Sequence, residues 1–185
     1  MPGLALVIGV LALLKVAGNG DEGPAELLRC PPDGRSRRAL GLVTVTLVGI
    51  VFGFRILAGA AAAKLGVLDS WTQGFNERLC FGTPIEAALR AFSSIVLAPF
   101  GEEMAYRGVL FGALATRLRT HRAALASALL FAAMHGYGVI GFSSVALSGY
   151  LRARVSARTG TLLPAILSHT LNNAVAIAWE LTLRG

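Results

Sequence analysis

The apolar residues of this chain gather into six runs, and most of the charged residues lie between the runs. The runs cover residues 4–17, 39–66, 86–116, 123–137, 139–155 and 161–182. A helix needs about 20 apolar residues to cross the hydrocarbon core of a bilayer. The pattern therefore predicts an all-α fold, a polytopic transmembrane bundle of about six helices.

Two of these runs differ from a simple span. Run 4–17 is short, but it lacks a basic leader and a small-residue cleavage site, so we expect an uncleaved first span. Run 86–116 would make a helix of about 46 Å at 1.5 Å per residue, which exceeds a typical bilayer core. Pro99 and Gly101 predict a bend or break in it, with a new helix that starts at Glu102.

The polar connections suggest how the chain is organised. Stretches 18–38 and 67–84 combine Gly, Pro and charged residues, which is typical of loops, and Trp71 suits the headgroup level of a membrane. We predict N-terminal membrane helices and loops over 1–84 and a C-terminal core over 85–185. The two parts are expected to form a single integrated domain.

Composition supports the membrane class. Hydrophobic residues make up 55% of the chain and charged residues only 15%, whereas soluble domains carry about 25% charged residues. A net charge of +7 would suit nucleic-acid binding in a soluble protein. Here the arginines of 117–122 and 152–158 lie in short connections, so the positive-inside rule explains them and we expect no nucleic-acid partner. These two clusters, together with 18–38, are predicted on the cytoplasmic face, and 67–84 on the opposite face.

A few polar residues interrupt the apolar runs. Glu102 and Glu103 stand side by side, with Arg107 shortly after them, and His135, His169 and Asn173 occur in later runs. A carboxylate at the centre of a bilayer costs about 3 kcal/mol on insertion scales, so such residues need partners or a function. Counted at about 1.5 Å per residue from the flanking arginines, the acid, the histidines and the amide lie roughly 16–22 Å deep. We therefore expect them to share one site.

Spacing within the runs supports a shared site. Glu103 and Arg107 are four residues apart on one helical face, in the favourable order for an ion pair. His169 and Asn173 share another face in the same way, which suggests joint action on one group. Phe131 lies four residues before His135 and is expected to pack beneath the site.

These three signatures, Glu102-Glu103-x-x-x-Arg107, Phe131-x-x-x-His135 and His169-x-x-x-Asn173, occur in this order over residues 102–173. Together they resemble the CPBP family of intramembrane proteases, which includes CAAX prenyl endopeptidases and bacteriocin-processing or self-immunity proteins. The resemblance implies a helical membrane fold around a polar cavity and a catalytic core within 85–185.

The resemblance also implies roles for individual residues. Glu102 and His135 would activate a water for attack on the scissile carbonyl, and His169 and Asn173 would stabilise the oxyanion. Glu103 and Arg107 would be a supporting pair that holds the first glutamate. The preferred mechanism requires no cofactor.

A metal-dependent mechanism remains open beside it. Glu102, His135 and His169 would supply three ligands for zinc, with a fourth position open to water. The chain has no His-Glu-x-x-His motif, however, and Asn173 is a poor zinc ligand. The two cysteines, Cys30 and Cys80, match no metal-ligand spacing.

Other interpretations also remain open. The Glu103–Arg107 pair is compatible with a purely structural role, and Asn172 is expected to bond across helices. Arg55 and Arg90 either extend to the membrane surface or face the cavity. Two alternatives for the whole chain are a non-catalytic immunity factor or scaffold and a small transporter with a proton relay. The transporter is less favoured because no inverted repeat is evident.

The expected partners are membrane lipid and a membrane-associated protein or peptide, cut near one terminus. Both a hydrolysed C-terminal tail and a leader peptide fit this class of substrate. The alanine- and arginine-rich composition is typical of a high-GC bacterium. We therefore expect a multi-pass protein of the bacterial inner membrane.

Overall fold

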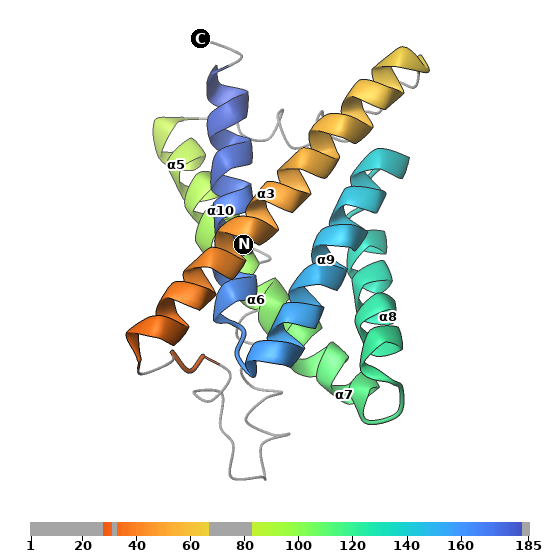
Figure 1. Ribbon diagram of the computed structural model, residues 1–185. Coiled ribbons are helices and arrows are strands. Elements are labelled where there is room, and N and C mark those ends of the chain that lie inside the picture. The colour runs from red at the N-terminus through yellow and green to blue at the C-terminus, as the bar shows by residue number, and fades with distance from the viewer. Residues whose placement is uncertain (1–27, 31–32, 67–82, 183–185) are drawn as a thin grey trace.

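The computed structural model describes residues 28–30, 33–66 and 83–182, and this part of the chain folds as five helical rods without a β-strand (Figure 1). The rods match five of the six predicted runs. The sixth run, 4–17, and the predicted interfacial Trp71 lie outside the described residues. The rods are α3 (Gly34–Lys64), a composite rod from 84 to 115, α8 (Thr120–Ala133), α9 (Val139–Thr159) and α10 (Leu163–Thr182).

The composite rod is one continuous helix. Its segments are α5 (Pro84–Phe92), η2 (Ser93–Leu97), α6 (Ala98–Glu103), η3 (Met104–Leu110) and α7 (Phe111–Ala115), of which η2 and η3 are π-helical. We predicted a bend or a break at Pro99 and Gly101; the break, and with it a new helix that starts at Glu102, is wrong. The wide π turn of η2 comes directly before Pro99 and accommodates it without interruption. Hydrogen bonds in a π turn reach five residues back, so the carbonyl four residues before the proline is not held against its ring.

Local sequence explains where two of the rods start. Thr83 caps α5 in a reciprocal capping box: its hydroxyl accepts the Glu86 amide at 3.3 Å, and the Glu86 carboxylate accepts the Thr83 amide at 2.7 Å. Asp33 caps α3 by accepting the Ser36 amide at 2.7 Å. As a result α3 starts inside the stretch 18–38, all of which we predicted as loop.

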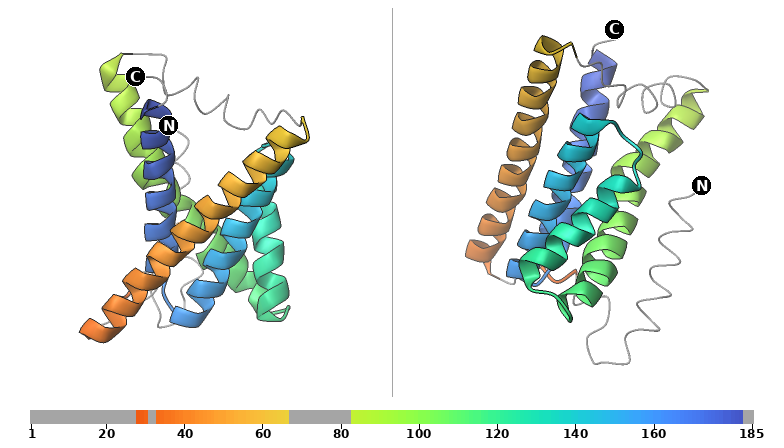
Figure 2. Two further views of the ribbon diagram at one scale, coloured as in Figure 1. Left: turned by 45° about the horizontal axis from the view of Figure 1, so that its top comes forward. Right: turned by 90° about the vertical axis from the view of Figure 1, so that its right-hand side faces the viewer.

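The rods pack around α9 and α10. The hairpin of α8 and α9 has an interface of small residues such as Ala123, Ala128 and Ala153, and α3 crosses diagonally over both α9 and α10 (Figures 1 and 2). The start of α3, the α7–α8 connection and the α9–α10 connection lie at one end of the bundle. These are the connections that we placed on one membrane face.

Polar and apolar side chains are distributed in the opposite way to a soluble protein. Large apolar side chains such as Leu42, Leu57, Ile85 and Trp179 are more than 60% exposed, whereas Glu103, Arg107 and Arg152 are buried. Exposed apolar surface on this scale is typical of a surface that contacts another apolar phase.

One described helix, Ser36–Lys64, is long and apolar enough to cross a membrane, with a mean hydropathy of 2.2. We predicted, in contrast, that each of the six apolar runs forms a membrane-spanning helix. The other described rods fall short by this measure because α8 has only 14 residues and the remaining three contain the polar residues that line the site.

Candidate active site

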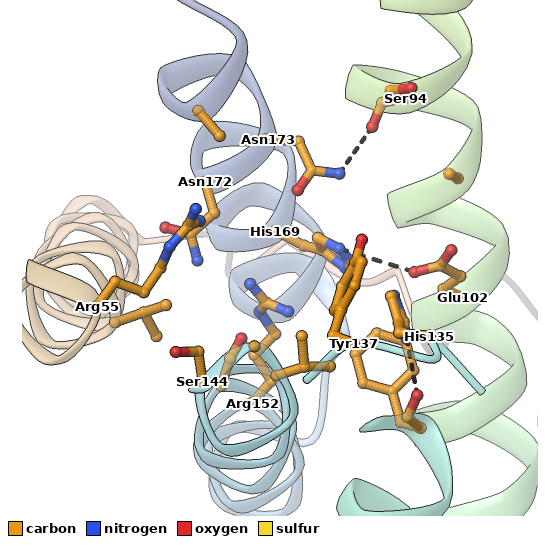
Figure 3. Close-up of a pocket in the computed structure, with 17 residues that line it drawn as sticks. Arg55, Ser94, Glu102, His135, Tyr137, Ser144, Arg152, His169, Asn172 and Asn173 are labelled. Carbon is orange, nitrogen blue, oxygen red and sulfur yellow. Dashed lines mark hydrogen bonds and ion pairs between the residues drawn. The ribbon is translucent and has the colours of Figure 1, made fainter. Parts of the chain in front are cut away.

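A cavity of about 290 Å³ lies between α3, the composite rod, the α8–α9 hairpin and α10 (Figure 3). Glu102, His135, His169 and Asn173 all line it. The four residues predicted to share a site are thus brought together from two rods and a turn.

Glu103 is the charged centre behind this cavity. It is fully buried, and its carboxylate lies 3.2 Å from Arg107 Nε, which confirms the predicted ion pair. It also lies 3.6 Å from Arg152 Nη1 and accepts a 2.8 Å hydrogen bond from His169 Nδ1. Two guanidinium groups flank this carboxylate, so its negative charge is compensated in the interior. Glu103 therefore orients a histidine, a contact that the predicted pairing with Arg107 alone did not include.

Arg107 is held on its other side by an aromatic ring. Its Cζ lies 4.3 Å from the centre of the Phe131 ring, a cation–π contact. Gly149 of α9 leaves the room for this guanidinium, because a Cβ at that position would lie 2.6 Å from Arg107 Nη2. The glycine thus serves the charged cluster as well as the close approach of α8 and α9.

His169 links the two glutamates. Its Nδ1 donates to Glu103, and its Nε2 lies 3.7 Å from Glu102 Oε2. A carboxylate on one ring nitrogen fixes the orientation of the imidazole and directs the other nitrogen at its target, as in a catalytic triad. The arrangement therefore places His169 Nε2 beside Glu102, at the cavity.

His135 lies beyond the end of a helix. We predicted it on a helix over 123–137, but α8 ends at Ala133 and Gly136 follows with a φ of 63°. The ring still packs on Phe131, with centroids 4.6 Å apart, and Nδ1 lies 2.8 Å from the Phe131 carbonyl oxygen. A carbonyl only accepts, so Nδ1 carries the proton and Nε2 of the neutral ring is an acceptor.

Asn173 is held by a backbone group that the composite rod leaves available. The Ala98 amide bonds to the Ser93 carbonyl in the π pattern, so the next amide, that of Pro99, would bond to the Ser94 carbonyl. Proline has no N–H. The Ser94 carbonyl instead accepts Asn173 Nδ2 at 2.8 Å, and the second N–H of that amide remains for another acceptor.

The structure adds residues that the sequence prediction missed. Arg152 was assigned to a surface cluster of arginines, which is wrong: it is buried in α9, lines the cavity and bonds to Ser168 Oγ at 3.4 Å. Ser148 and Ser144, one and two turns earlier, line the cavity with it. A polar residue at every fourth position of an otherwise apolar run was the signal that would have revealed this stripe. Tyr137 also lines the cavity, and no pattern pointed to it.

Two other residues of the lining lie away from Glu102. Arg55 of α3 faces the cavity, which decides between the two positions that we considered for it (Figure 3). Asn172 lies beside it, and its Oδ1 is buried without a hydrogen-bond partner among the described residues. The expected bond across helices is therefore not made by that oxygen.

The donor set does not fit the zinc site that we considered. Within residues 28–30, 33–66 and 83–182, no three His, Cys, Asp or Glu side chains are grouped so as to hold a metal ion. The Nδ1 atoms of His135 and His169 are engaged by Phe131 and Glu103, which leaves Nε2 as the available nitrogen of each ring.

Comparison with known proteins gives one match. Residues 84–175 match the family model described as type II CAAX prenyl endopeptidase, Rce1-like. No curated protein and no solved structure matches the chain. The matched range includes all three sequence signatures, whereas α3 lies outside it.

Proposed function

From the premise that residues 84–175 belong to the Rce1-like family of type II CAAX prenyl endopeptidases, we propose that this chain is an intramembrane endopeptidase. Its substrate would be a membrane-associated protein or peptide, cut near one terminus. One observation carries the proposal: Glu102, His135, His169 and Asn173 line a single small cavity behind which a charged cluster orients His169.

The geometry supports a hydrolytic mechanism in two steps. Glu102 and His135 Nε2 are acceptors at the cavity, and either is suited to take a proton from a water as its oxygen attacks the scissile carbonyl carbon. The carbonyl π electrons move to oxygen and form a tetrahedral oxyanion. When the C–N bond breaks, the proton passes to the leaving amine.

Asn173 and His169 would stabilise the oxyanion. The free N–H of Asn173 is directed by its bond to Ser94, and His169 is held by Glu103, so little reorganisation is needed when charge develops. His169 Nε2 donates to the oxyanion when its ring is protonated, because Nδ1 already donates to Glu103.

We also propose that the bundle crosses the membrane several times. The family is embedded in membranes, α3 qualifies as a span, and every described rod has at least one exposed large apolar side chain. Lipid would cover this surface, and a bacterial inner membrane is the proposed location.

Substitution of Glu102 by Gln tests the proposed activity. It keeps the shape of the side chain but removes the base, and general base catalysis contributes about 10²–10⁴-fold in rate. We expect the variant to fold and insert, while the cleaved termini seen with the wild type disappear from the membrane proteome. The measurement is mass spectrometry of protein termini in cells with the wild type, the variant or neither.

Glu86→Gln is a matched control for this substitution. Glu86 is exposed on the same rod, and glutamine also serves in a capping box, so cleavage should be unchanged. Undiminished cleavage by Glu102→Gln would refute the assignment. A cellular phenotype that survives both Glu102→Gln and His135→Ala would instead favour the non-catalytic immunity or scaffold role.

A further inference from the structure

The arginines at one end of the bundle belong to a long stretch of the chain that has no acidic residue. Residues 104–179 contain seven arginines but neither an aspartate nor a glutamate. Two of the seven, Arg107 and Arg152, are buried against Glu103. The other five form what we call the basic surface, namely Arg117, Arg119, Arg122, Arg154 and Arg158.

The charge of the basic surface is not compensated by the rest of the described chain. Four of its side chains are exposed and Arg154 is half-buried, and none of the five forms an ion pair with another described residue. The stretch 18–38 has four acidic residues but also four arginines, so it adds no net charge. The five positive charges are therefore available to an anion from outside the chain.

Packing between α8 and α9 brings members of the basic surface together. Ala123 of α8 and Ala153 of α9 lie in one buried cluster. Arg122 directly precedes Ala123, and Arg154 directly follows Ala153. The arginines of 117–119 lie in the connection before α8, at the same end of the bundle as the end of α9 (Figure 1). Like charges held in one region repel one another, so a bound anion relieves this repulsion.

An exposed apolar face of α8 continues from the basic surface. Arg122, Leu125 and Leu129 share this face because they are three and four residues apart in turn. The two leucines are 44% and 41% exposed, and Leu129 lies about 10 Å along the axis from Arg122. A phospholipid has the same order of groups, an anionic headgroup followed by apolar chains. A small soluble anion would leave the leucines uncovered.

We propose that the basic surface and this face of α8 bind an anionic phospholipid in the leaflet at that end of the bundle. The guanidinium groups donate to the phosphate oxygens, and the leucines contact the acyl chains. A headgroup with two phosphates, as in cardiolipin, matches a cluster of five arginines better than a headgroup with one. The site rests on the proposed membrane location and is independent of the peptidase activity.

This site is more specific than the rule that places arginines on the cytoplasmic side of a membrane. That rule depends on the number of positive charges in a connection and requires no bound lipid. Arg37 and Arg38 allow the two effects to be separated. Both are exposed at the start of α3, at the same end of the bundle, but they belong to the stretch 18–38 with its equal numbers of acids and arginines.

Lipid titration followed by native mass spectrometry tests the site. The full chain in detergent is titrated with cardiolipin, phosphatidylglycerol and phosphatidylcholine, and we expect the affinity to decrease in that order. A surface arginine strengthens the binding of an anionic lipid about fivefold. The double variant with Arg122→Gln and Arg154→Gln should therefore bind cardiolipin about 25-fold more weakly, with its affinity for phosphatidylcholine unchanged.

The matched control is the double variant with Arg37→Gln and Arg38→Gln, which removes the same charge from the same end of the bundle. Its affinity for cardiolipin should equal that of the wild type. Helicity shows that each variant is folded. Resistance to carbonate extraction from membranes shows that each variant is inserted, and it tests the proposed membrane location separately from lipid binding.

Several outcomes would contradict the proposal. Equal affinities for cardiolipin and phosphatidylcholine, or equal losses of affinity in the two double variants, would overturn it. Binding of glycerol phosphate as tight as that of the lipid would refute the role of the leucine face. Polyglutamate that binds more tightly than cardiolipin, in a manner that depends on Arg122, would instead assign the basic surface to an acidic protein. Cleavage is measured in none of these experiments, so their outcomes leave the peptidase assignment unaffected.

Discussion

At the scale of single residues, Glu103 carries more contacts than its neighbour Glu102. It bonds to His169 and lies against both Arg107 and Arg152 in the interior. Glu102 is partly exposed to the cavity, and its Oε2 lies 3.7 Å from His169 Nε2. The two adjacent acids therefore have different tasks: Glu103 holds the site together, and Glu102 is available for chemistry.

This division predicts different stabilities for two matched variants. Glu103→Gln leaves two buried guanidinium groups without a compensating carboxylate, and loss of one partner from a buried ion pair costs about 3–5 kcal/mol. Glu102→Gln should cost much less. Loss of helicity during thermal unfolding in detergent measures both, and equal melting temperatures for the two variants would contradict the assignment.

At the scale of elements, the π turn of η2 is the feature that connects backbone geometry to the site. With Pro99 directly after it, the turn leaves the Ser94 carbonyl free to bind Asn173. Pro99 is therefore a positioning residue: because it cannot donate to the Ser94 carbonyl, that carbonyl remains available to hold Asn173.

Pro99→Ala tests this role. The restored N–H would bond to the Ser94 carbonyl and release Asn173. We expect kcat to fall about tenfold and KM to stay within twofold. This decrease in kcat is smaller than the 10²–10³-fold loss on complete removal of an oxyanion donor, because Asn173 is still present. Stability should not fall, since alanine is the better residue inside a helix. Ser93→Ala, whose side chain does not line the cavity, is the control in the same assays. An unchanged kcat in Pro99→Ala would rule out the positioning role.

At the scale of the whole molecule, the bundle has two ends of different character. The arginine-bearing connection between α7 and α8 lies at the same end as the connection between α9 and α10, and the turn between α8 and α9 lies at the other end (Figure 1). Arg152 is buried and no longer counts as a surface charge. The end with the α7–α8 and α9–α10 connections still has five other arginines, namely Arg117, Arg119, Arg122, Arg154 and Arg158.

Cysteine labelling tests this topology. In a background of Cys30→Ser and Cys80→Ser, Arg119→Cys and Arg158→Cys should react with a membrane-impermeant maleimide only in inverted vesicles. Met134→Cys, at an exposed position of the α8–α9 turn, should react only in right-side-out vesicles. Reaction of all three from the same side would exclude the proposed arrangement.

Much of the fold followed from local patterns. Five apolar runs became five rods, because long apolar segments form helices wherever their faces find an apolar environment. The Glu103–Arg107 pair and the shared site of Glu102, His135, His169 and Asn173 followed from helical spacing and depth. The division of the chain at 84/85 and the catalytic roles of these residues remain predictions.

The sequence by itself determined the helical class, the membrane-like composition and the family signatures, since these depend on residue type and on spacing within one helix. Only the tertiary structure decided that Arg152 is buried, that His135 lies in a turn, that the rod continues through Pro99, and that Arg55 faces the cavity. Each of these depends on which groups from other rods are near: a charge is buried only where a partner compensates it, and a carbonyl freed by proline is useful only where a donor reaches it. Such partners lie up to 79 positions apart in the chain, as Asn173 and Ser94 do, and no local pattern encodes their proximity.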